Sequence, residues 1–463
     1  MTSSPTAASV PADQTPRRKL SPTEIAEVLR RHRRFLARET GGMRAMLQFH
    51  DLSARDLSNC DLSEADLTGA SLAQSRSPGV SFRRANLFCA DLRMANLSHA
   101  DFTGADLRGV CLRGAELSDA VLVGTDIQAA AMARYNSTGD PQFVDFDEIP
   151  AQLAAIVARR ANFTNAKLSG SFVLRADLTD AILTNAEMRG TDLRNSVLIG
   201  ASMTGVDLSG AKLNGAALAG ADLTGAQITG ADFANADVRG AVIDPEAMDC
   251  EELKSAIRSR RLRLEGSALA ELLNQHRIWL DTLSKSGARA NLAEADMSGQ
   301  SFAGADLTIA QMTRCALRDS DLSGGKFALA DMAFSDLRGA DLSHADLRGV
   351  SLERATLTGA NLSSAKLAPM EHVGMQQRVT CSNLGRARLA GANLRGADLR
   401  KVNFAGANLG DADLSDADLT DADLSAAKLA GANLKGTVLS GAILTDVVGM
   451  DAAALAGSQG PIA

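Results

Sequence analysis

The chain has 463 residues, of which 45% are hydrophobic but only 3% aromatic, and it contains 40 glycines. A core without large rings has to be filled by many small side chains at regular positions, so this composition favours a repeat protein over a set of ordinary domains. The net charge of −7 excludes neither an acidic nor a basic partner, although residues 1–46 carry nine Lys or Arg against four Asp or Glu and are therefore locally basic.

The cysteines and the apolar residues exclude several further classes of protein. The six cysteines are far apart and form no CxxC pair, which argues against a zinc knuckle and against a disulfide framework. No run approaches the ~18 apolar residues that a membrane span needs, and residues 1–20 lack the apolar stretch of a secretion signal. We therefore interpret residues 1–20 as a disordered tail and expect a cytoplasmic protein without a membrane span.

Residues 21–46 are predicted to form a helical cap. The apolar residues have the spacing of an amphipathic helix, at Ile25, Val28, Leu29 and Leu36. Such a helix can cover the open end of the repeats that follow, whose unpaired edge would otherwise recruit other strands. Two alternatives remain: the His32–Arg33 pair could bind a ligand, and the arginines could contact nucleic acid or an acidic membrane surface. No interleaved aromatic residues support the second alternative.

From Leu47 onward, a large apolar residue recurs every five positions. The unit is A-[DN]-L-x-x, with Ala two positions before the leucine, Asp or Asn between them, and often Gly last. A period of five fits neither an α-helix nor a free strand. If each unit forms one side of a square coil, Leu and Ala point inward, four units make a coil of 20 residues, and coils stack ~4.8 Å apart through backbone hydrogen bonds. Glycine suits the corner between two sides.

Written in full, the pattern reads ANLSHADFTGADLRG at 95–109 and GANLRGADLRKVNFAGANLGDADLSDADL at 391–419. It resembles the pentapeptide-repeat protein family. The resemblance implies an all-β solenoid, a right-handed quadrilateral parallel β-helix, here with short α-helical caps and two irregular breaks. The repeats are predicted at 47–127, 161–243, 289–367 and 386–446.

Two breaks interrupt the repeats, at 128–160 and 368–385. The first shifts the repeat frame by one residue and contains Tyr135, Phe143 and Phe146, in a chain with few aromatic residues. Loops on a rigid scaffold often carry recognition, and the resemblance implies the same, because loops of gyrase-directed family members contribute to the target contact. The alternative is a lateral bulge or a hinge between two coil stacks. The second break is expected at the corresponding place of the other half.

The second half of the chain repeats the first. The segment LRRHRRFL at 29–36 aligns with LNQHRIWL at 273–280. The alignment matches three pairs of residues: His32 with His276, Arg33 with Arg277, and Phe35 with Trp279. We interpret this as a tandem duplication, in which residues 244–288 form a linker with the second cap helix and residues 447–463 a C-terminal tail.

The stretch GDADLSDADLTDADLS at 410–425 contains no basic residue and six aspartates: Asp411, Asp413, Asp416, Asp418, Asp421 and Asp423. In stacked coils, residues 20 apart are neighbours, so Asp413 is expected between Asn393 and Asn433, and the acid forms a ring around one coil. Such dilution limits like-charge repulsion and indicates that these aspartates mainly follow from the repeat. The best acidic column along a stack is Asp66, Asn86, Asp106 and Asp126. Both groups of aspartates are candidate interaction surfaces.

No motif for catalysis, phosphate binding or a cofactor is present, and carboxylates that face water lack the environment that separates the pKa values of a catalytic pair. We expect no enzyme activity, cofactor, metal site or small-molecule substrate. The favoured function is a rigid scaffold for an unknown protein partner. The alternative, implied by the resemblance, is a DNA-mimicking inhibitor or protector of a type II topoisomerase, DNA gyrase or topoisomerase IV. Nucleic acid itself is not an expected partner.

Overall fold

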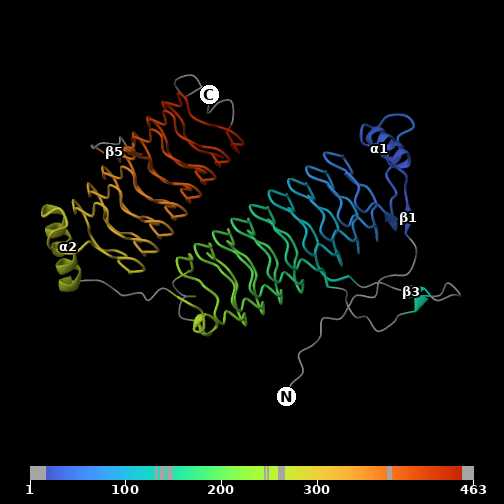
Figure 1. Ribbon diagram of the computed structural model, residues 1–463, viewed down its shortest axis with the longest axis horizontal. Helices are drawn as coiled ribbons and strands as arrows, with labels where there is room; N and C mark the ends of the chain where they lie inside the picture. The colour runs from blue at the N-terminus through green and yellow to red at the C-terminus, as the bar shows by residue number, and fades with distance from the viewer. Residues whose placement is uncertain are drawn as a thin grey trace, which may run out of the picture. The chain divides into compact units, whose positions relative to one another are not determined.

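The computed structural model describes residues 17–130, 134–135, 141–142, 150–244, 247, 250–258, 266–372 and 378–450. The chain divides into two compact units. One comprises Met1–Val197, Ser202–Ala216 and Ala226–Asp232, and the other Leu198–Ala201, Ala217–Gly225 and Phe233–Ala463. The first unit contains helix α1, Pro22–Leu36, and the second contains helix α2, Gly266–Asp281. Each helix lies at the beginning of a series of stacked coils (Figure 1).

The coils are held together by parallel pairing between residues 20 positions apart. Met46 pairs with Asp66, and Asp66 pairs with Asn86, each as a single parallel bridge. Two backbone hydrogen bonds flank each bridge. The N–H of the leucine after the bridged residue donates to a carbonyl of the next coil, as from Leu47 N to Asp66 O at 2.7 Å. The N–H of the bridged residue in that next coil donates back, as from Asp66 N to Ala45 O at 2.9 Å. We call the coils within residues 46–257 the first stack and those within residues 290–448 the second stack.

Most bridges are one residue wide, so few segments are long enough to count as strands. Strand β1, Arg18–Lys19, pairs in parallel with β2, His50–Asp51. Strands β3, Arg134–Tyr135, and β4, Pro141–Gln142, form an antiparallel pair in the first break. Strands β5, Met370–His372, and β6, Arg378–Thr380, do the same in the second break.

Each corner of a coil is a tight turn. The N–H of the inward alanine donates to the carbonyl of the preceding leucine, as from Ala65 to Leu62 at 3.1 Å. The residue before the alanine has a positive φ, which defines a type II turn. Glycine takes this place in many units, such as Gly69 with φ 63°, and asparagine in others, such as Asn59 with φ 55°. The expectation that glycine marks the corners is therefore confirmed, and its physical basis is the left-handed backbone.

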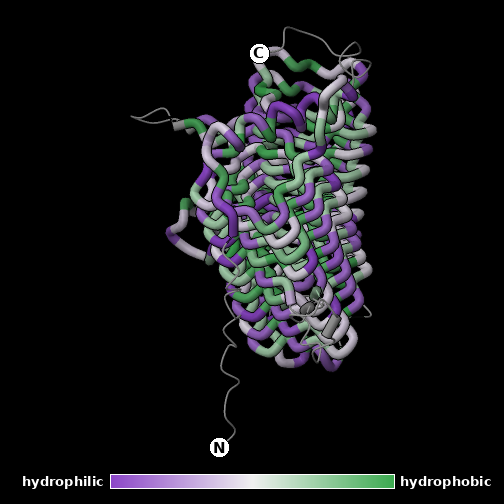
Figure 2. The backbone as a smooth tube through the Cα atoms, turned by 90° about the vertical axis from the view of Figure 1, so that its right-hand side faces the viewer, coloured by the Kyte–Doolittle hydropathy of each residue, from purple (hydrophilic) through white to green (hydrophobic). Residues whose placement is uncertain are grey.

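The inward residues form a continuous apolar core. Leu62, Ala65 and Leu67 are completely inaccessible to solvent, and hydrophobic and hydrophilic segments are mixed along the stacked coils (Figure 2). Where phenylalanine replaces leucine in adjacent coils, the rings stack, as do Phe82 and Phe102 with centroids 5.2 Å apart. Burying each leucine contributes about 1.5–3 kcal/mol, so the columns of leucines dominate the stability of both stacks.

The first break is a lateral excursion and not a hinge. On its two sides Cys111 pairs with Gln152 and Asp126 with Lys167, in the same parallel manner as elsewhere. These partners lie 41 positions apart instead of 20, so 21 extra residues are inserted between them. Because 21 is not a multiple of five, the repeat frame shifts by one. The coils resume at Ala151, which is buried, earlier than the predicted residue 161.

The second break leaves its stack at a different side from the first. Ser351 pairs with Asn383 across it, 32 positions apart, so 12 extra residues are inserted. Bridged residues of successive coils form a column along each side of a stack. Asp126, next to the first break, lies in the column that begins at Met46. Lys366, next to the second break, lies in the column that begins at Asp306. Counted from the start of each stack, the second excursion begins one side earlier. The expectation of corresponding places is therefore wrong.

Both stacks extend beyond their predicted ends. In the first, Asp237 pairs with Ile257, and the short 3-10 helix η2, Glu251–Leu253, buries Leu253 against the coils. The predicted linker at 244–288 therefore begins with the last coil edge of the first stack. In the second stack, Lys428 pairs with Val448.

Candidate interaction surface

Helix α1 begins with a complete capping box. Ser21 Oγ accepts the N–H of Glu24 at 3.2 Å, and the Glu24 carboxylate accepts the N–H of Ser21 at 2.8 Å. Pro22 occupies the first helical turn, where no N–H is needed. These contacts define where the helix starts.

The residues repeated in the two helices divide into buried and exposed members. His32 and His276 are completely buried, and each stacks on the aromatic residue three positions later, with centroids 5.8 Å from Phe35 and 5.8 Å from Trp279. Arg33 and Arg277 are exposed. Arg277 donates to Asn274 at 3.1 Å on its own helix. The structure thus uses the repeated histidine and ring to attach the helix to the coils.

The basic N-terminal segment is extensively paired with its own acids. Arg30 makes two hydrogen bonds of 2.8 Å to the Glu27 carboxylate, Arg31 makes a third, and Arg18 pairs with Glu24 at 2.7 Å. Arg30 and Arg31 together lower the pKa of Glu27 to about 2. These pairs are exposed, so they add little stability, but they neutralise part of the charge that a nucleic acid would need.

The six aspartates of residues 410–425 occupy two kinds of structural position. Three lie at the left-handed corners, which asparagine and aspartate tolerate better than other non-glycine residues: Asp411, Asp416 and Asp421, with φ of 55°, 60° and 58°. The other three each accept the N–H two residues later at 2.9–3.0 Å: Asp413, Asp418 and Asp423. Asp413 lies between Asn393 and Asn433, as predicted. Each of the six thus occupies a position that suits aspartate or asparagine.

The predicted acidic column, Asp66, Asn86, Asp106 and Asp126, exists as a column but is partly neutralised. Arg108 binds the Asp106 carboxylate through two hydrogen bonds of 2.9 and 2.7 Å, and its guanidinium lies 5.4 Å from the centroid of the Phe88 ring. The next residue of the column after Asp126 is Lys167. This surface therefore presents less negative charge than its sequence suggests.

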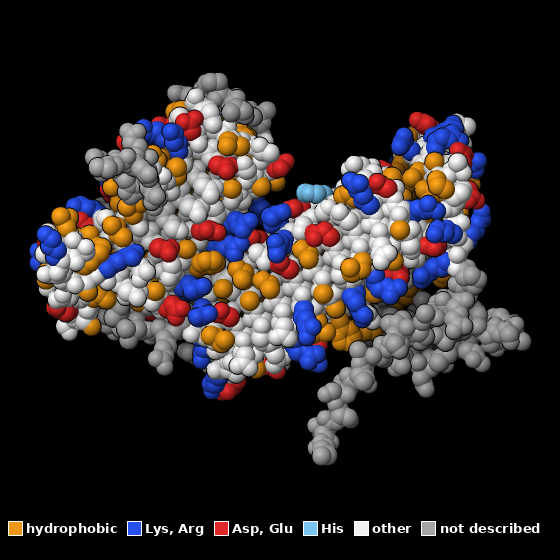
Figure 3. All heavy atoms as spheres, viewed as in Figure 1, with side chains coloured by type: hydrophobic (Ala, Val, Ile, Leu, Met, Phe, Trp, Pro, Cys, Tyr) orange, Lys and Arg blue, Asp and Glu red, His pale blue; other side chains and the backbone are white. Residues whose placement is uncertain are grey.

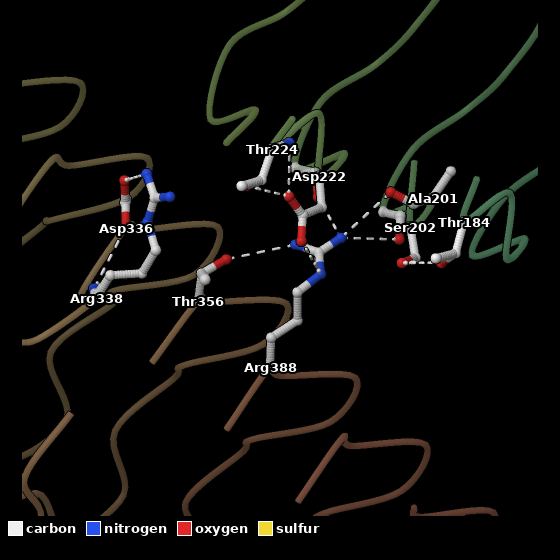
Figure 4. A network of polar contacts seen from close by, with 11 residues as sticks. Thr184, Ala201, Ser202, Asp222, Thr224, Asp336, Arg338, Thr356 and Arg388 are labelled. Carbon is white, nitrogen blue, oxygen red and sulfur yellow. Dashed lines mark hydrogen bonds and ion pairs between the residues drawn. The ribbon is translucent and has the colours of Figure 1, made fainter. Parts of the chain in front are cut away.

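The same local pairing recurs wherever arginine stands two positions after an outward aspartate. Figure 4 shows Asp336 held by Arg338 through bonds of 2.9 and 2.8 Å, and Asp222 held instead by the N–H and hydroxyl of Thr224 at 3.1 and 2.7 Å. Figure 3 shows acidic and basic side chains interspersed on the face in view. An arginine after the leucine thus neutralises the aspartate of its own unit, and an arginine of a neighbouring coil can do the same, as Arg83 does for Asp101 at 2.8 Å.

Sequence reasoning missed a longer polar column in the second stack. We call it the Asn/Asp ladder; its bridged residues are Ser301, Asp321, Asp341, Asn361, Asn393, Asp413 and Asn433. The column itself contains no Lys or Arg, although Arg395 lies at an adjacent corner, 3.5 Å from Asp416. The ladder crosses the second break, because Asn361 pairs with Asn393.

Side-chain hydrogen bonds connect successive residues of the Asn/Asp ladder. Asn361 donates to Asp341 at 3.0 Å, Asn393 to Asn361 at 3.1 Å, and Asn433 to Asp413 at 2.9 Å. Burial by itself raises the pKa of Asp413, but hydrogen bonds from Ser415 and Asn433 outweigh it, so this pKa lies below its usual value. A hydrogen bond from Ser323 likewise lowers the pKa of Asp321. Both carboxylates are therefore ionised at neutral pH.

The aromatic candidates of the first break are only partly placed. Tyr135 belongs to β3, and Phe143 and Phe146 lie outside the described residues. The role of all three in recognition stays a prediction. His99 and His344 occupy left-handed corners with φ of 59° and 57°.

Other kinds of site were sought in the described part of the chain. It contains no group of three or more His, Cys, Asp or Glu side chains arranged to hold a metal ion. None of its helices has the length and hydropathy needed to cross a membrane.

A comparison with curated proteins finds no match. Among solved structures, the chain is similar to a pentapeptide repeat protein from the Arabidopsis thaliana thylakoid lumen, with 31% identity, 27% of this chain and 69% of that chain covered, and a TM-score of 0.16. It is also similar to Rfr23 from the cyanobacterium Cyanothece 51142, at 27% identity, 31% and 90% coverage, and a TM-score of 0.19.

A third similar structure is QnrB1, a plasmid-mediated fluoroquinolone resistance protein, at 16% identity, 36% and 91% coverage, and a TM-score of 0.21. The sequence profile of the family described as pentapeptide repeats matches well over half of the chain, at residues 51–76, 70–104, 100–134, 159–195, 201–240, 288–324, 335–368, 382–421 and 417–447. The chain therefore belongs to the pentapeptide repeats family.

Proposed function

We propose that the chain is a non-catalytic scaffold, built of right-handed quadrilateral parallel β-helices, that binds a protein partner through the Asn/Asp ladder. The observation that carries this proposal is the ladder itself, a seven-residue column without a basic member in which side-chain hydrogen bonds link three of the successive pairs. Six unpaired cysteines support a reducing compartment, and we propose the cytoplasm.

The ladder has the physical properties of a binding surface. Its side chains repeat at the coil spacing of ~4.8 Å, and their hydrogen bonds restrict them before a partner arrives. A partner therefore loses less side-chain entropy on binding than it would on a mobile surface. Three ladder carboxylates, Asp321, Asp341 and Asp413, favour a partner that presents Lys or Arg, since complementary charge directs both association and orientation.

Affinity capture with matched variants tests this proposal. The first bait is wild type, and the second carries Asp321→Asn, Asp341→Asn and Asp413→Asn, which keeps the shape of the ladder and removes its charge. A third bait carries Asp66→Asn, Asp106→Asn and Asp126→Asn in the first stack. We expect proteins captured by wild type and by the third bait to be lost from the second. Retention of the same partners by the second bait would show that the ladder is not the contact surface.

The alternative function is a DNA mimic directed at DNA gyrase or topoisomerase IV. The family resemblance and the lengthwise course of the ladder favour it, but the charge density does not. DNA carries a negative charge every ~1.7 Å, so a length of ~29 Å, which seven residues at ~4.8 Å occupy, would need about 17 charges. The ladder offers three aspartates. A gyrase supercoiling assay decides: inhibition or drug protection at micromolar protein supports the mimic, and no effect removes it.

A further inference from the structure

In each helix, the buried histidine accepts a hydrogen bond that the leucine carbonyl of a preceding repeat accepts elsewhere in the coils. At the corners of the coils, the inward alanine donates its N–H to the preceding leucine carbonyl, as Ala295 does to Leu292 at 3.0 Å. The first inward alanines of the two stacks have no preceding repeat. Ala45 instead donates to Nδ1 of His32, and Ala290 to Nδ1 of His276, each at 3.0 Å.

The second ring nitrogen of His276, Nε2, lies near a backbone carbonyl of the first coil that has no partner coil. In later coils, a carbonyl one residue after the leucine accepts an N–H from the coil before it, as Arg348 O does from Leu329 N at 2.9 Å. Thr308 O, in the first coil of the second stack, has no such coil and lies 3.1 Å from Nε2 of His276. One neutral imidazole, protonated at Nε2, thus satisfies both an N–H and a C=O of the coil edge.

The first stack repeats this arrangement with one difference. His32 Nε2 is buried and has no hydrogen-bond partner among the described residues, although the backbone of Ser63, which corresponds to Thr308, lies near enough to raise its pKa. The helix packs closely in both copies. A Cβ atom on Gly42 would collide with the backbone of Phe35, and one on Gly287 with the backbone of Gln275.

The charged groups around the two histidines are few. His32 faces Asp61 and Glu64 of the first coil, which favour its protonation, and Arg44, which opposes it. His276 faces Asp306, which favours protonation, and Arg289, which opposes it. Burial is the largest effect at both sites and holds both pKa values below 6.5. Both rings are therefore neutral at pH 7, as the hydrogen bond from the alanine requires.

We propose that His32 and His276 are acid-sensitive latches that hold the two cap helices on the coil edges. When a proton from solvent binds the lone pair of Nδ1, the acceptor for the alanine N–H is lost and two donors face each other. The imidazolium is also a charge in a buried site. Both effects favour detachment of the helix, which exposes the coil edge and the apolar side of the helix to other molecules.

The direction of the pH effect follows from linkage. Because each histidine has a lower pKa when the cap is closed than the 6.5 of an open one, closure is fully favoured above pH 6.5 and is lost as pH falls through the pKa of the closed state. Between these two values, the closing equilibrium of each cap changes about tenfold per pH unit, since one proton is taken up.

The sole tryptophan gives a direct readout for one latch. Trp279 is stacked on His276 with an angle of 15° between the rings, so its emission reports on the imidazole beside it. We propose to titrate the full chain from pH 7.5 to 4.5 and to record Trp279 fluorescence together with hydrogen exchange at Ala45 and Ala290. Wild type is expected to show a fluorescence transition centred below pH 6.5. Exchange protection of both alanines should fall by about tenfold per pH unit once corrected for intrinsic rates.

Three variants separate this latch from other acid effects. His276→Asn keeps an acceptor near the position of Nδ1 but does not titrate, so its Trp279 emission and its Ala290 protection should not change over this range. His32→Asn should lose only the Ala45 response. His344→Asn, at an exposed corner, should behave as wild type. Flat wild-type titrations overturn the proposal, as does an unchanged transition in His276→Asn. If circular dichroism shows that His276→Asn is unfolded, wild-type exchange at Ala45 and Ala290 decides alone.

Discussion

Two glycines at corners in the same column provide a test of how the coils are aligned, through the unfolding free energies of their alanine variants. Gly391 and Gly431 lie on either side of Asp411, with φ of 64° and 73°. A Cβ atom on Gly391 would meet nothing within 4 Å, whereas one on Gly431 would collide with Oδ1 of Asp411. Replacing each by alanine therefore imposes the same backbone strain, but only Gly431→Ala also displaces a side chain.

The expected magnitudes follow from these two terms. An L-residue in the left-handed region costs about 1–2 kcal/mol, so Gly391→Ala should lower the free energy of unfolding by that amount. Forcing the Asp411 side chain off its rotamer adds about 0.5–1.5 kcal/mol, so Gly431→Ala should cost more. In the background Asp411→Gly, the additional cost of Gly431→Ala should disappear. Wild type, Gly431→Ala, Asp411→Gly and the double variant together form a double-mutant cycle.

Urea unfolding followed by circular dichroism measures these differences, read as shifts of the midpoint at constant slope. The expected order is wild type, then Gly391→Ala, then Gly431→Ala. If the two alanine variants had equal midpoints, or if Asp411→Gly failed to reduce the cost of Gly431→Ala, Asp411 would not lie against Gly431 and the register of these coils would be refuted.

Three further predictions concern the second stack. Leu414→Ala, at a completely buried position, should lower the free energy of unfolding by about 2–5 kcal/mol. Asp413→Asn, at the outward position next to it, should lower it by less than about 1 kcal/mol. Equal losses in urea unfolding would contradict the assignment of Leu414 as inward and Asp413 as outward. Ser382 Oγ donates to Leu347 O at 3.0 Å and accepts from Gly349 N at 2.9 Å. Ser382→Ala should therefore lower the free energy of unfolding by about 1–3 kcal/mol and speed hydrogen exchange at Gly349. Unchanged exchange at Gly349 would refute the hydrogen bond from Gly349 to Ser382. Because the pKa of Asp413 is lowered from 3.8, its contribution is present above pH 3.8 and lost as pH falls through the folded value; an acid titration by circular dichroism should thus show a smaller loss of stability in Asp413→Asn than in wild type.

The period of five residues predicted most of the coil. It identified the inward leucines and alanines, the glycine corners and the neighbours of Asp413, because each depends only on spacing within an uninterrupted run. It also explained the acidic stretch at 410–425 as a consequence of the repeat. The structure supplies the reason, since corners and residues before the leucines both favour aspartate or asparagine.

The breaks set the limit of that reasoning. The Asn/Asp ladder could not be assembled from the sequence, because pairing Asn361 with Asn393 requires the length of the second excursion, which the period does not contain. Nor did the spacing show that Arg108 would neutralise Asp106. For the cap helices, the alignment found the repeated His–Arg pair but could not tell which member was buried; only the contacts of His32 and His276 with the first coils separate them.

Binding of a captured partner to two purified proteins tests the central claim most directly. One is wild type and the other carries Asp321→Asn, Asp341→Asn and Asp413→Asn. If the ladder is the contact surface, the variant should unfold at nearly the same urea concentration as wild type and bind the partner at least about tenfold more weakly, a loss of about 1.4 kcal/mol. Equal dissociation constants for the two proteins would contradict the claim.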